Sequence, residues 1–468
     1  MGKQLFTFFI LIIVSAVFIT SCKKDTFINS AEARLYITAD TLKYDTVLTS
    51  TGSVTKSFKI INENNQKLLL SKVKLMGGST SAYKINVNGT AATEVDNIEV
   101  AANDSIYVFV SVTINPNAAN LPFIVSDSIL VNYNGNNRYV QLQAFGQNAN
   151  FLRGRVITGN VVWSSTLPYV ILGSLRVDTT ATLTIQPGVR IYSHADAPFI
   201  VDGTLIVNGT KTDSVVFAGD RLDDGYRDYP AGWPGIYFRG SSKNNILKHA
   251  VVKNAYQAIV TEQPSINANP KVILHQCIVD NAYDAGIYCI NSSLQADNSL
   301  VSNCGKNVLI SYGGAYTFTN CTVAAYSNAF INHKDPALTV SNAALSNGTV
   351  VTANLTANFT NCIFWGDAGF VDNEISVTKQ GANTFAVAFN NNIYRCLTDP
   401  SNSTLTANIK NIDPSFDSVD VIKQVYNFRV TKNATAPGIN KGVATIFPFD
   451  LDDKNRSNGV TDIGCYEK

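Results

Sequence analysis

The chain has few histidines and cysteines and no excess of either charge. Its 468 residues include 4 histidines and 8 cysteines, with 36 Lys plus Arg against 35 Asp plus Glu. We find no HExxH zinc motif, no Walker loop, no nucleophile elbow and no dinucleotide fingerprint. No basic stripe is visible either, so the sequence gives no support for nucleic acid as a partner.

The sequence also lacks amphipathic helical patterns of useful length and instead alternates apolar and polar residues. In SIYVFVSVTI, residues 105–114, every second residue is Ile or Val, and this period of two is typical of a half-buried strand. Residues 33–148 hold seven or eight such short runs, separated by turn residues and containing no cysteine. We therefore expect an immunoglobulin-like β-sandwich here, without a pinning disulfide.

From residue 149 to 468 the pattern becomes a repeat. Segments such as VILHQCIV (272–279), YTFTNCTV (316–323) and NFTNCIF (358–364) align, and three successive alignment spacings are 22 residues. One aligned column reads Ala250, Cys277, Ser299, Cys321, Ala343, Cys362, Asn392. The column before it reads His249, Gln276, Asn298, Asn320, Asn342, Asn361, Asn391. Self-similarity at this period predicts a solenoid.

The residue types select among solenoids. Leucine-rich repeats need several fixed leucines, and propeller blades need about 40 residues each. A coil of 22 residues rich in Val, Ile, Phe and Thr instead fits three short strands and their bends, stacked at about 4.8 Å. At this point the sequence resembles the right-handed, pectin-lyase-like parallel β-helix family. The expected fold class is thus all-β, with an N-terminal Ig-like sandwich followed by a right-handed parallel β-helix.

The repeated asparagines and cysteines have a structural explanation in such a fold. Asn tolerates unusual backbone angles at a bend, and its amide can bond to the same amide one coil away. We expect this ladder to contain Asn298, Asn320, Asn342, Asn361 and Asn391. The next side chain points inward, so Cys277, Cys321 and Cys362 are expected to pack as small buried residues. We expect a coil to separate Cys277 from Cys321, and the Ala343 coil to separate Cys321 from Cys362, too far for a disulfide or a shared metal.

The densest set of chemically capable side chains is GDRLDDGYRDYPAGWPGIYF, residues 219–238. Carboxylates that act on their own or through calcium, with arginines to neutralise charge and rings to stack on a sugar, are what a glycan site needs. The catalytic candidates are Asp220, Asp223, Asp224, Asp228, Arg221 and Arg227, and the stacking candidates are Tyr226, Tyr229 and Trp233. The alternative is a loop whose arginines pair with its own aspartates while Trp233 leads into the next strand.

A second acidic cluster lies in FPFDLDDKNRSNGVTDIGCYE, residues 447–467. Asp450 and Asp452 are weak calcium candidates, because the glycine and closing glutamate of a calcium loop are absent; no other cofactor is expected. The segment resembles the closing segment of many bacterial β-helix proteins. That resemblance implies a polar cap on the last coil, in which the aspartates and Arg456 satisfy one another.

The N-terminus predicts a membrane address. Residues 1–21 contain an apolar run of about 15 residues, short for a span of roughly 20, and read as a signal peptide. Ile19-Thr20-Ser21-Cys22 resembles the bacterial lipobox, which implies lipidation of Cys22 followed by a linker over residues 22–32; the alternative is a plain secretory signal. Lys23-Lys24-Asp25 resembles lipoprotein sorting signals that favour the outer membrane, with the periplasmic and cell-surface faces both open.

The whole chain resembles Bacteroidota lipoproteins that carry an Ig-like sandwich before a β-helix. The resemblance rests on the lipobox, GSVTKSFKIINENNQ (52–66), the GDRL and GWPGIYF elements, the Asn ladder and the DIGCYE end, and it transfers no catalytic residue. Polygalacturonase signatures of the same fold are missing. We expect a non-catalytic envelope lipoprotein whose solenoid wall binds a polysaccharide or a surface protein. The alternatives are a polysaccharide lyase or glycoside hydrolase acting through the 219–238 loop, and a structural spacer.

Overall fold

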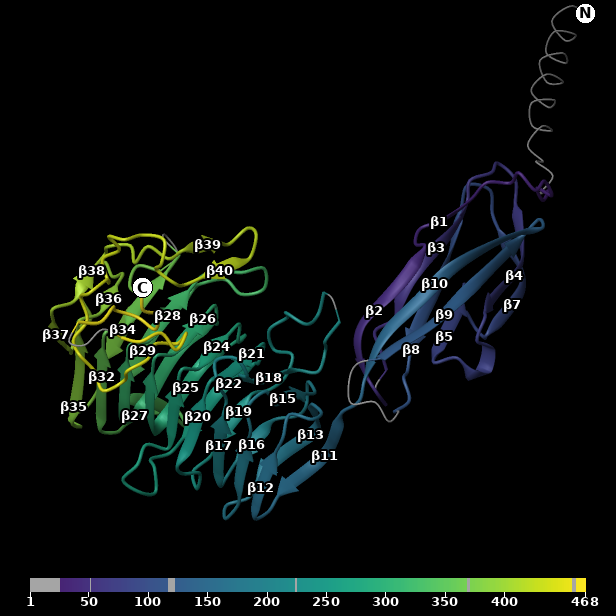
Figure 1. The fold of residues 1–468 in the computed structure, drawn as a ribbon. Helices are drawn as coiled ribbons and strands as arrows, with labels where there is room; N and C mark the ends of the chain where they lie inside the picture. Colours follow the sequence, from purple (N-terminus) through teal and green to yellow (C-terminus); the bar gives the residue numbers. More distant parts are fainter. Residues whose placement is uncertain (1–25, 51, 117–122, 224, 368–370, 457–459) are drawn as a thin grey trace, which may run out of the picture. The chain divides into compact units, whose positions relative to one another are not determined.

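The computed structural model describes residues 26–50, 52–116, 123–223, 225–367, 371–456 and 460–468. The expected signal peptide and Cys22 lie outside these residues. The chain divides into two compact units between Asn148 and Ala149. Both units are built from strands (Figure 1), and the all-β fold class is confirmed. Within the described part of the chain, no helix is long and apolar enough to cross a membrane.

The first unit is a sandwich of two five-stranded sheets. One sheet has the order β1 (Leu35–Ile37), β3 (Lys56–Asn62), β8 (Ser105–Val112), β5 (Tyr83–Val87), β6 (Thr90–Ala91). The other has the order β2 (Thr41–Leu48), β10 (Asn136–Gln147), β9 (Phe123–Tyr133), β4 (Leu68–Leu75), β7 (Glu94–Val100). A short 3-10 helix, η2 (Gly78–Thr80), follows β4. All pairs are antiparallel except β2 with β10, which is parallel.

Alternation along the strands builds the sandwich core. In β8 the side chains of Ile106, Val108, Val110 and Val112 are buried, whereas Tyr107 and Phe109 are exposed. Each fully buried Val or Ile contributes roughly 1.5–3 kcal/mol relative to an exposed one. Residues 27–31, expected to be part of a linker, are tied to this unit: the Asn134 amide donates to the carbonyls of Ile28 and Ser30.

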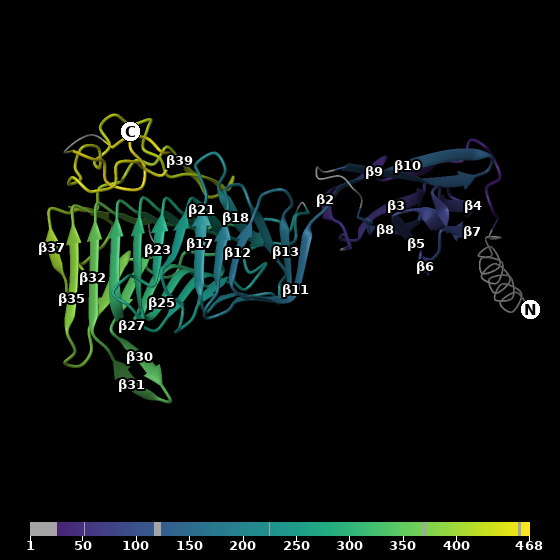
Figure 2. The same cartoon turned by 60° about the horizontal axis from the view of Figure 1, so that its bottom comes forward.

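The second unit is a parallel β-helix, in which every described strand of the 26-stranded sheet pairs in parallel with its equivalents one coil away. Figures 1 and 2 show these strands as a regular stack of parallel arrows. Four long strands each contribute to two faces: β11 (Asn150–Ile157), β13 (Tyr169–Val177), β25 (Ala285–Asp297) and β27 (Lys306–Thr319). Inward-pointing residues form one continuous core along the solenoid.

Three faces make up each coil. The first face continues from the start of β13 through β15 (Arg190–Ser193), β18 (Val215–Gly219), β21 (Ala250–Lys253), β24 (Ile278–Asp280), β26 (Leu300–Ser302), β28 (Thr322–Ala325), β33 (Ile363–Gly366), β36 (Ile393–Tyr394) and β38 (Ile409–Lys410). The second face continues from the end of β13 through β16 (Phe199–Val201), β19 (Ile236–Phe238), β22 (Gln257–Glu262), the first halves of β25 and β27, β29 (Leu338–Ser341) and β34 (Ile375–Thr378).

The third face holds β12 (Asn160–Trp163), β14 (Thr182–Ile185), β17 (Thr204–Asn208), β20 (Asn245–Lys248), β23 (Val272–His275), the second halves of β25 and β27, β32 (Leu355–Thr360), β35 (Phe385–Asn390) and β37 (Thr404–Thr406). The turn from the second to the third face encloses Lys271, which is fully buried. Its ammonium donates to the carbonyls of Arg239, Gly240 and Glu262 at 3.0, 2.9 and 2.8 Å.

The predicted asparagine ladder lies at the turn from the third to the first face, here called the ladder turn. Asn298, Asn320, Asn361 and Asn391 have φ of 46°, 51°, 54° and 55°, a left-handed conformation that Asn adopts at lower cost than most residues. The Asn361 amide donates to the Asn320 side-chain oxygen at 2.9 Å. The amide-to-amide bond expected of the ladder is therefore present between these coils.

Asn342 was wrongly placed in the ladder. The preceding segment, β29, stacks on the second face, and Asn342 bonds to the backbone of Gln380 instead. The chain then leaves the solenoid as a hairpin of β30 (Ala343–Ser346) and β31 (Thr349–Thr352), which Figure 2 shows projecting from the stack. Leu345, which aligned with inward-facing residues, is 76% exposed. The apolar–polar alternation is the same on all three faces, so the sequence pattern alone assigned the wrong face.

Because the β30–β31 hairpin leaves the solenoid, the expected spacing of two cysteines was wrong. The pairing of Thr322 with Ile363 puts Cys321 and Cys362 on directly neighbouring coils, with no Ala343 coil between them. Cys277 and Cys321 are two coils apart, as expected, with Ser299 between them. All three thiols are buried and free, and burial raises the pKa of the Cys277 thiol to about 12. They pack as small core residues.

The C-terminal segment, residues 416–468, lies along the side of the solenoid. It includes the hairpin β39 (Ser418–Asp420) and β40 (Val425–Asn427), and Figure 2 shows its yellow trace running over several coils. Leu300 and Ala324 on the outer side of the first face pack against its Phe428, Leu451 and Tyr466. Farther along, its Ile463 packs in the same way. The residues in contact there are Ile363, Trp365 and Ile393.

The expectation of an end cap was therefore wrong, because this segment covers a side of the solenoid. Arg456 donates to the side chains of Asn298 and Glu467 at 3.0 and 2.8 Å and to the Gly464 carbonyl at 2.8 Å. Farther along the ladder turn, Asn361 donates to the Val443 carbonyl at 2.8 Å. The segment thus crosses coil after coil, and we call it the covering segment.

Candidate functional site

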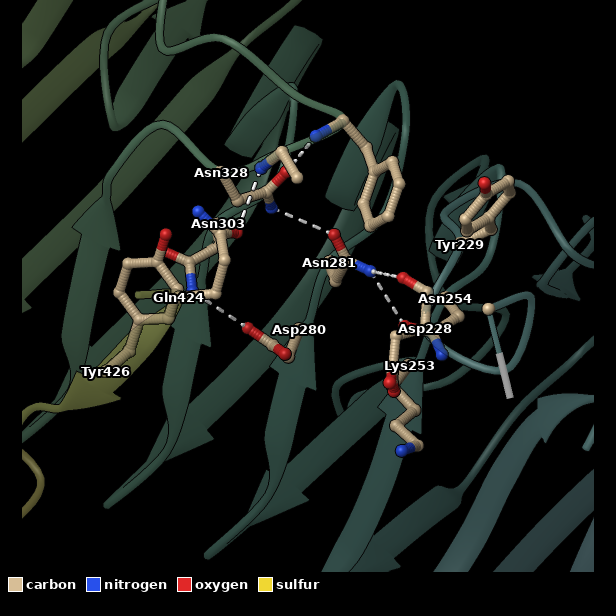
Figure 3. A pocket seen from close by; sticks show the side chains of 13 residues that line it. Asp228, Tyr229, Lys253, Asn254, Asp280, Asn281, Asn303, Asn328, Gln424 and Tyr426 are labelled. Atoms are coloured by element: carbon tan, nitrogen blue, oxygen red, sulfur yellow. Dashed lines mark hydrogen bonds between the residues drawn. The ribbon is translucent and has the colours of Figure 1, made fainter. Parts of the chain in front are cut away.

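A groove lies at the turn from the first to the second face, beside the β39–β40 hairpin of the covering segment. The groove has a volume of about 510 Å³. Its walls come from four places: the 219–238 loop, the turns after β21, β24 and β26, residues 328–330, and the β39–β40 hairpin. Figure 3 shows side chains from all four pointing toward a common space. Part of the sequence-predicted loop is therefore in the groove, beside residues that the sequence did not single out.

A second row of asparagines forms the floor of the groove. Asn254, Asn281 and Asn303 directly follow three consecutive strands of the first face and have φ of 60°, 55° and 52°. The Asn281 amide donates to the Asn254 side-chain oxygen at 2.9 Å and accepts a bond from Asn328 at 3.0 Å. We call this row the groove ladder.

The groove ladder also holds the 219–238 loop in place. Asn254 and Asn281 donate to the loop carbonyls of Arg227 and Asp228 at 2.6 and 2.8 Å. The loop returns to the second face at Gly235, whose φ is 123°. A Cβ at Gly235 would lie 1.6 Å from the Gln257 carbonyl oxygen, so only glycine fits this position.

Aromatic rings line the groove and its entrance. The ring of Tyr229 lies 4.5 Å from that of Phe330 and 5.2 Å from that of Tyr226, and all three side chains are exposed by more than 40%. Tyr426 of β40 forms part of the opposite wall, and its hydroxyl donates to the Ser327 carbonyl at 2.8 Å. These rings come from three segments that are distant in the sequence.

The prediction that Trp233 stacks on a ligand is wrong. Only 1% of the residue is exposed, and its indole nitrogen donates to the Lys253 carbonyl at 2.9 Å. It packs in the solenoid core ahead of β19. A buried Trp finds a hydrogen-bond partner for its N–H in this way and has no face left for a ligand.

The predicted charged residues of the loop divide between the groove and internal pairs. Asp228 lines the groove, and its carboxylate lies 3.5 Å from the guanidinium of Arg227. Arg221 pairs with Asp223 through two hydrogen bonds of 2.8 and 3.1 Å and lies over the Tyr226 ring. Because of this pair, the pKa of Arg221 is raised above its usual value.

Asp220 is not part of the described groove lining. Asp220 accepts a bond of 2.7 Å from the imidazole of His194, on the preceding coil. Asp224 lies outside the described residues. The predicted cluster is therefore not one site: Asp228 faces the groove, and Asp220 and Asp223 are engaged elsewhere.

Asp280 is the groove carboxylate that the sequence analysis missed. It directly follows Lys253 in register and precedes Ser302 on the next coil. Its Oδ1 accepts bonds from the Ser302 hydroxyl at 2.7 Å and, more weakly, from the Asn303 amide at 3.4 Å. Burial raises the pKa of the Asp280 carboxyl, opposed by these bonds and by the charge of Lys253. A carboxyl with a raised pKa in a groove is a candidate proton donor.

A smaller hollow adjoins the groove and shares Phe330 with it. Its volume is about 250 Å³, and two exposed rings, Tyr256 and Tyr283, stack at its edge with centroids 5.9 Å apart. The Lys306 ammonium lies 3.2 Å from the Asp284 carboxylate there. The aromatic lining thus continues from the groove along the turn.

The calcium candidates of the C-terminal segment are engaged by protein groups. Asp450 accepts backbone N–H bonds from Asp452, Lys454 and Glu467 at 2.7–2.8 Å. Asp452 accepts a bond of 2.8 Å from Arg429 and also pairs with Lys211. Among the described residues, no group of three or more His, Cys, Asp or Glu side chains is placed to hold a metal ion.

The comparisons with known proteins bear on the solenoid. A family model described as a pectate-lyase like beta helix domain matches residues 154–260, so the chain contains a pectate-lyase-like β-helix domain. No curated protein matches the chain. The match covers the coils that carry the 219–238 loop and ends before Asp280.

Three solved structures are similar to parts of the chain. A family 123 glycoside hydrolase from Clostridium perfringens is 12% identical over 27% of this chain and 30% of its own, with a TM-score of 0.19. The seventh PapD-like domain of human CEP192 is 10% identical over 27% of this chain and 91% of its own, with a TM-score of 0.18. The catalytic unit of a GH87 alpha-1,3-glucanase from Streptomyces thermodiastaticus strain HF3-3 is 9% identical over 76% of this chain and 88% of its own, with a TM-score of 0.19. Likeness at this level carries no functional argument.

Proposed function

We propose that this protein is a lipid-anchored envelope protein that binds a glycan in the groove. The observation that carries the proposal is the convergence of aromatic rings on a floor of side-chain amides: the exposed Tyr229 and Phe330 and the half-buried Tyr426 come from three separate segments. Sugar rings offer C–H groups to an aromatic face and hydroxyls to amides and carboxylates, so this combination of groups suits a glycan.

The anchor is part of the same proposal. Ile19-Thr20-Ser21-Cys22 supports lipidation of Cys22, and Lys23-Lys24-Asp25 supports the outer membrane as the destination. Metabolic labelling with an alkyne fatty acid tests the anchor: label is expected on the full chain and absent from the Cys22→Ser variant. A plain secretory signal would leave both unlabelled.

Glycan binding is tested by titration calorimetry of residues 23–468 against a panel of plant, algal and host glycans. Tyr229→Ala and Phe330→Ala are each expected to weaken binding by between roughly twofold and tenfold, the worth of one ring contact. Tyr36→Ala is the matched control, because Tyr36 is an exposed ring, 52% accessible, in the sandwich. If no glycan of the panel binds, a protein partner or a role as a structural spacer is favoured.

A second candidate function is cleavage of the bound glycan. It is favoured by the presence of two carboxyls of different environment in one groove, the half-buried Asp280 with its raised pKa and the exposed Asp228. Such a pair can divide the roles of general acid and base. The same panel should be followed for new reducing ends and for absorbance from unsaturated products. Cleavage that disappears in Asp280→Asn while binding persists would make the groove an active site.

A further inference from the structure

The described lining of the groove offers hydrogen-bond acceptors but lacks the cations that would bind an acidic sugar. Among the described residues that line it, two are carboxylates, Asp228 and Asp280, and Lys253 alone is cationic. Lys253 is next to Asp280 in register, and their charges attract each other. In the adjoining hollow, two lysines, Lys306 and Lys334, are matched by two aspartates, Asp284 and Asp335, and Lys306 is paired with Asp284. Proteins recognise sugar carboxylates with arginine pairs or bound calcium, and the described lining provides neither.

One acceptor of the groove floor lacks a partner. Asn303 is only 4% exposed, and its Oδ1 is buried without a hydrogen bond. Its Nδ2 is directed to Asp280 Oδ1 at 3.4 Å, which leaves Oδ1 to be satisfied from elsewhere. An unpaired buried acceptor costs about 1–3 kcal/mol. Since the terminal torsion of Asn is soft, a small rotation of this amide brings Oδ1 to the groove.

The neighbouring amides are already satisfied, which sets Asn303 apart. Asn281 is bonded to Asn254, Asn328 and the Asp228 carbonyl. Among the groups left for a ligand, three are acceptors: Asn303 Oδ1 and the ionised carboxylates of Asp280 and Asp228. A ligand that complements these three groups donates hydrogen bonds to them.

We propose that the groove selects a neutral, hydroxyl-rich glycan and rejects polyuronates, the substrates after which its β-helix family is named. A sugar hydroxyl donates to Asn303 Oδ1 or to a carboxylate, whereas the ionised carboxylate of a uronate only accepts and is repelled by the carboxylates of Asp280 and Asp228. The inference rests on glycan binding as proposed above and adds the class of glycan.

The test compares two polymers that differ only in the acid. Polygalacturonate is measured before and after chemical reduction of its carboxyl groups to hydroxymethyl groups, alongside neutral β-linked oligosaccharides, with residues 23–468 in titration calorimetry. Binding is expected for neutral ligands and not for the unreduced acid. Asn303→Gly, which keeps the positive φ of 52°, is expected to weaken neutral binding about tenfold.

A double variant that removes the two groove carboxylates tests the charge repulsion. In Asp228→Asn/Asp280→Asn the repulsion is removed, and affinity for polygalacturonate is expected to rise at least about tenfold. Asp196 is an exposed aspartate outside the groove lining. Asp196→Asn is therefore the control, and it should leave the affinity for both ligands unchanged. Wild-type binding of polygalacturonate that is lost in Lys253→Met would overturn this inference and leave glycan binding standing. Binding of no glycan at all would overturn the proposed function and this inference with it.

Discussion

The two rows of asparagine share one backbone conformation but have different surroundings. In the ladder turn, Asn298, Asn320 and Asn361 have positive φ, and the covering segment binds their amides. In the groove ladder, Asn281 and Asn303 have the same conformation but lie beneath an open groove. Asparagine thus meets the same backbone requirement at both turns, and the turns differ in whether the covering segment packs over them.

The largest expected effect is on the covered side. Arg456 is 5% exposed and bonded to Asn298, Glu467 and Gly464. Arg456→Ala leaves these groups unpaired in the interior, so we expect the free energy of unfolding to fall by about 3–5 kcal/mol. All 3 tryptophans lie in the solenoid, so urea unfolding followed by tryptophan fluorescence reports this unit alone. Arg155→Ala, at an exposed arginine, should change little; equal losses would contradict the role of the covering segment.

A change within the ladder turn should cost less. Asn361→Gly keeps the positive φ of 54° and removes the bonds to Asn320 and Val443, which we expect to cost about 1–3 kcal/mol of unfolding free energy. Asn361→Ala should cost roughly a further 1 kcal/mol, because alanine is strained in this conformation. Glycan affinity should be the same in both variants and in the wild type. A loss of affinity would show that the two turns are not independent.

The matching change in the groove ladder should show the opposite pattern. Asn281→Gly releases the Asp228 carbonyl and Asn328, so the loop and the opposite wall lose their common support. We expect glycan affinity to fall about tenfold, with a smaller loss of stability than in Asn361→Gly. Calorimetric titration and urea unfolding of the same samples measure both, and a variant that loses stability but binds normally would refute the assignment.

The smallest effect concerns pH. The folded-state pKa of Asp280 is raised above the ordinary 3.8, mainly by burial, so in the window between the two values the folded protein binds more protons than the unfolded chain. Unfolding free energy from this group therefore falls as pH rises through that window. Asp280→Asn should remove this fall and make the solenoid more stable at neutral pH, as measured by urea unfolding from pH 4 to 8. Asp196→Asn should keep the wild-type profile.

The sequence was sufficient where a local pattern repeats and insufficient where distant segments meet. The 22-residue period correctly predicted the β-helix, the bend with unusual backbone angles at Asn320, and the packing of Cys277 as a small buried residue. It misplaced Asn342, because strands of all three faces alternate in the same way and only the coil-to-coil pairing shows which face a segment joins. The contact between Arg456 and Asn298 spans 158 positions, and no local spacing reports it.

The candidate site shows the same limit. The 219–238 loop was recognised by its density of charged and aromatic residues, and Asp228 and Tyr229 of that loop do line the groove. Asp280 ends an ordinary strand and carries no motif. Its character comes from Lys253 and Ser302 on the neighbouring coils and from Asn303 beside it, all of which depend on register.

The covering segment also sets an order of events in folding. It contacts coils from Lys211 to Asn391, and therefore it can dock only after those coils have formed. Until then the outer side of the first face exposes Ile363 and Ile393, which Ile463 later covers. A chain that stops before residue 416 keeps this apolar stripe uncovered and is open to aggregation and proteolysis. Docking of the covering segment thus removes this stripe from solvent.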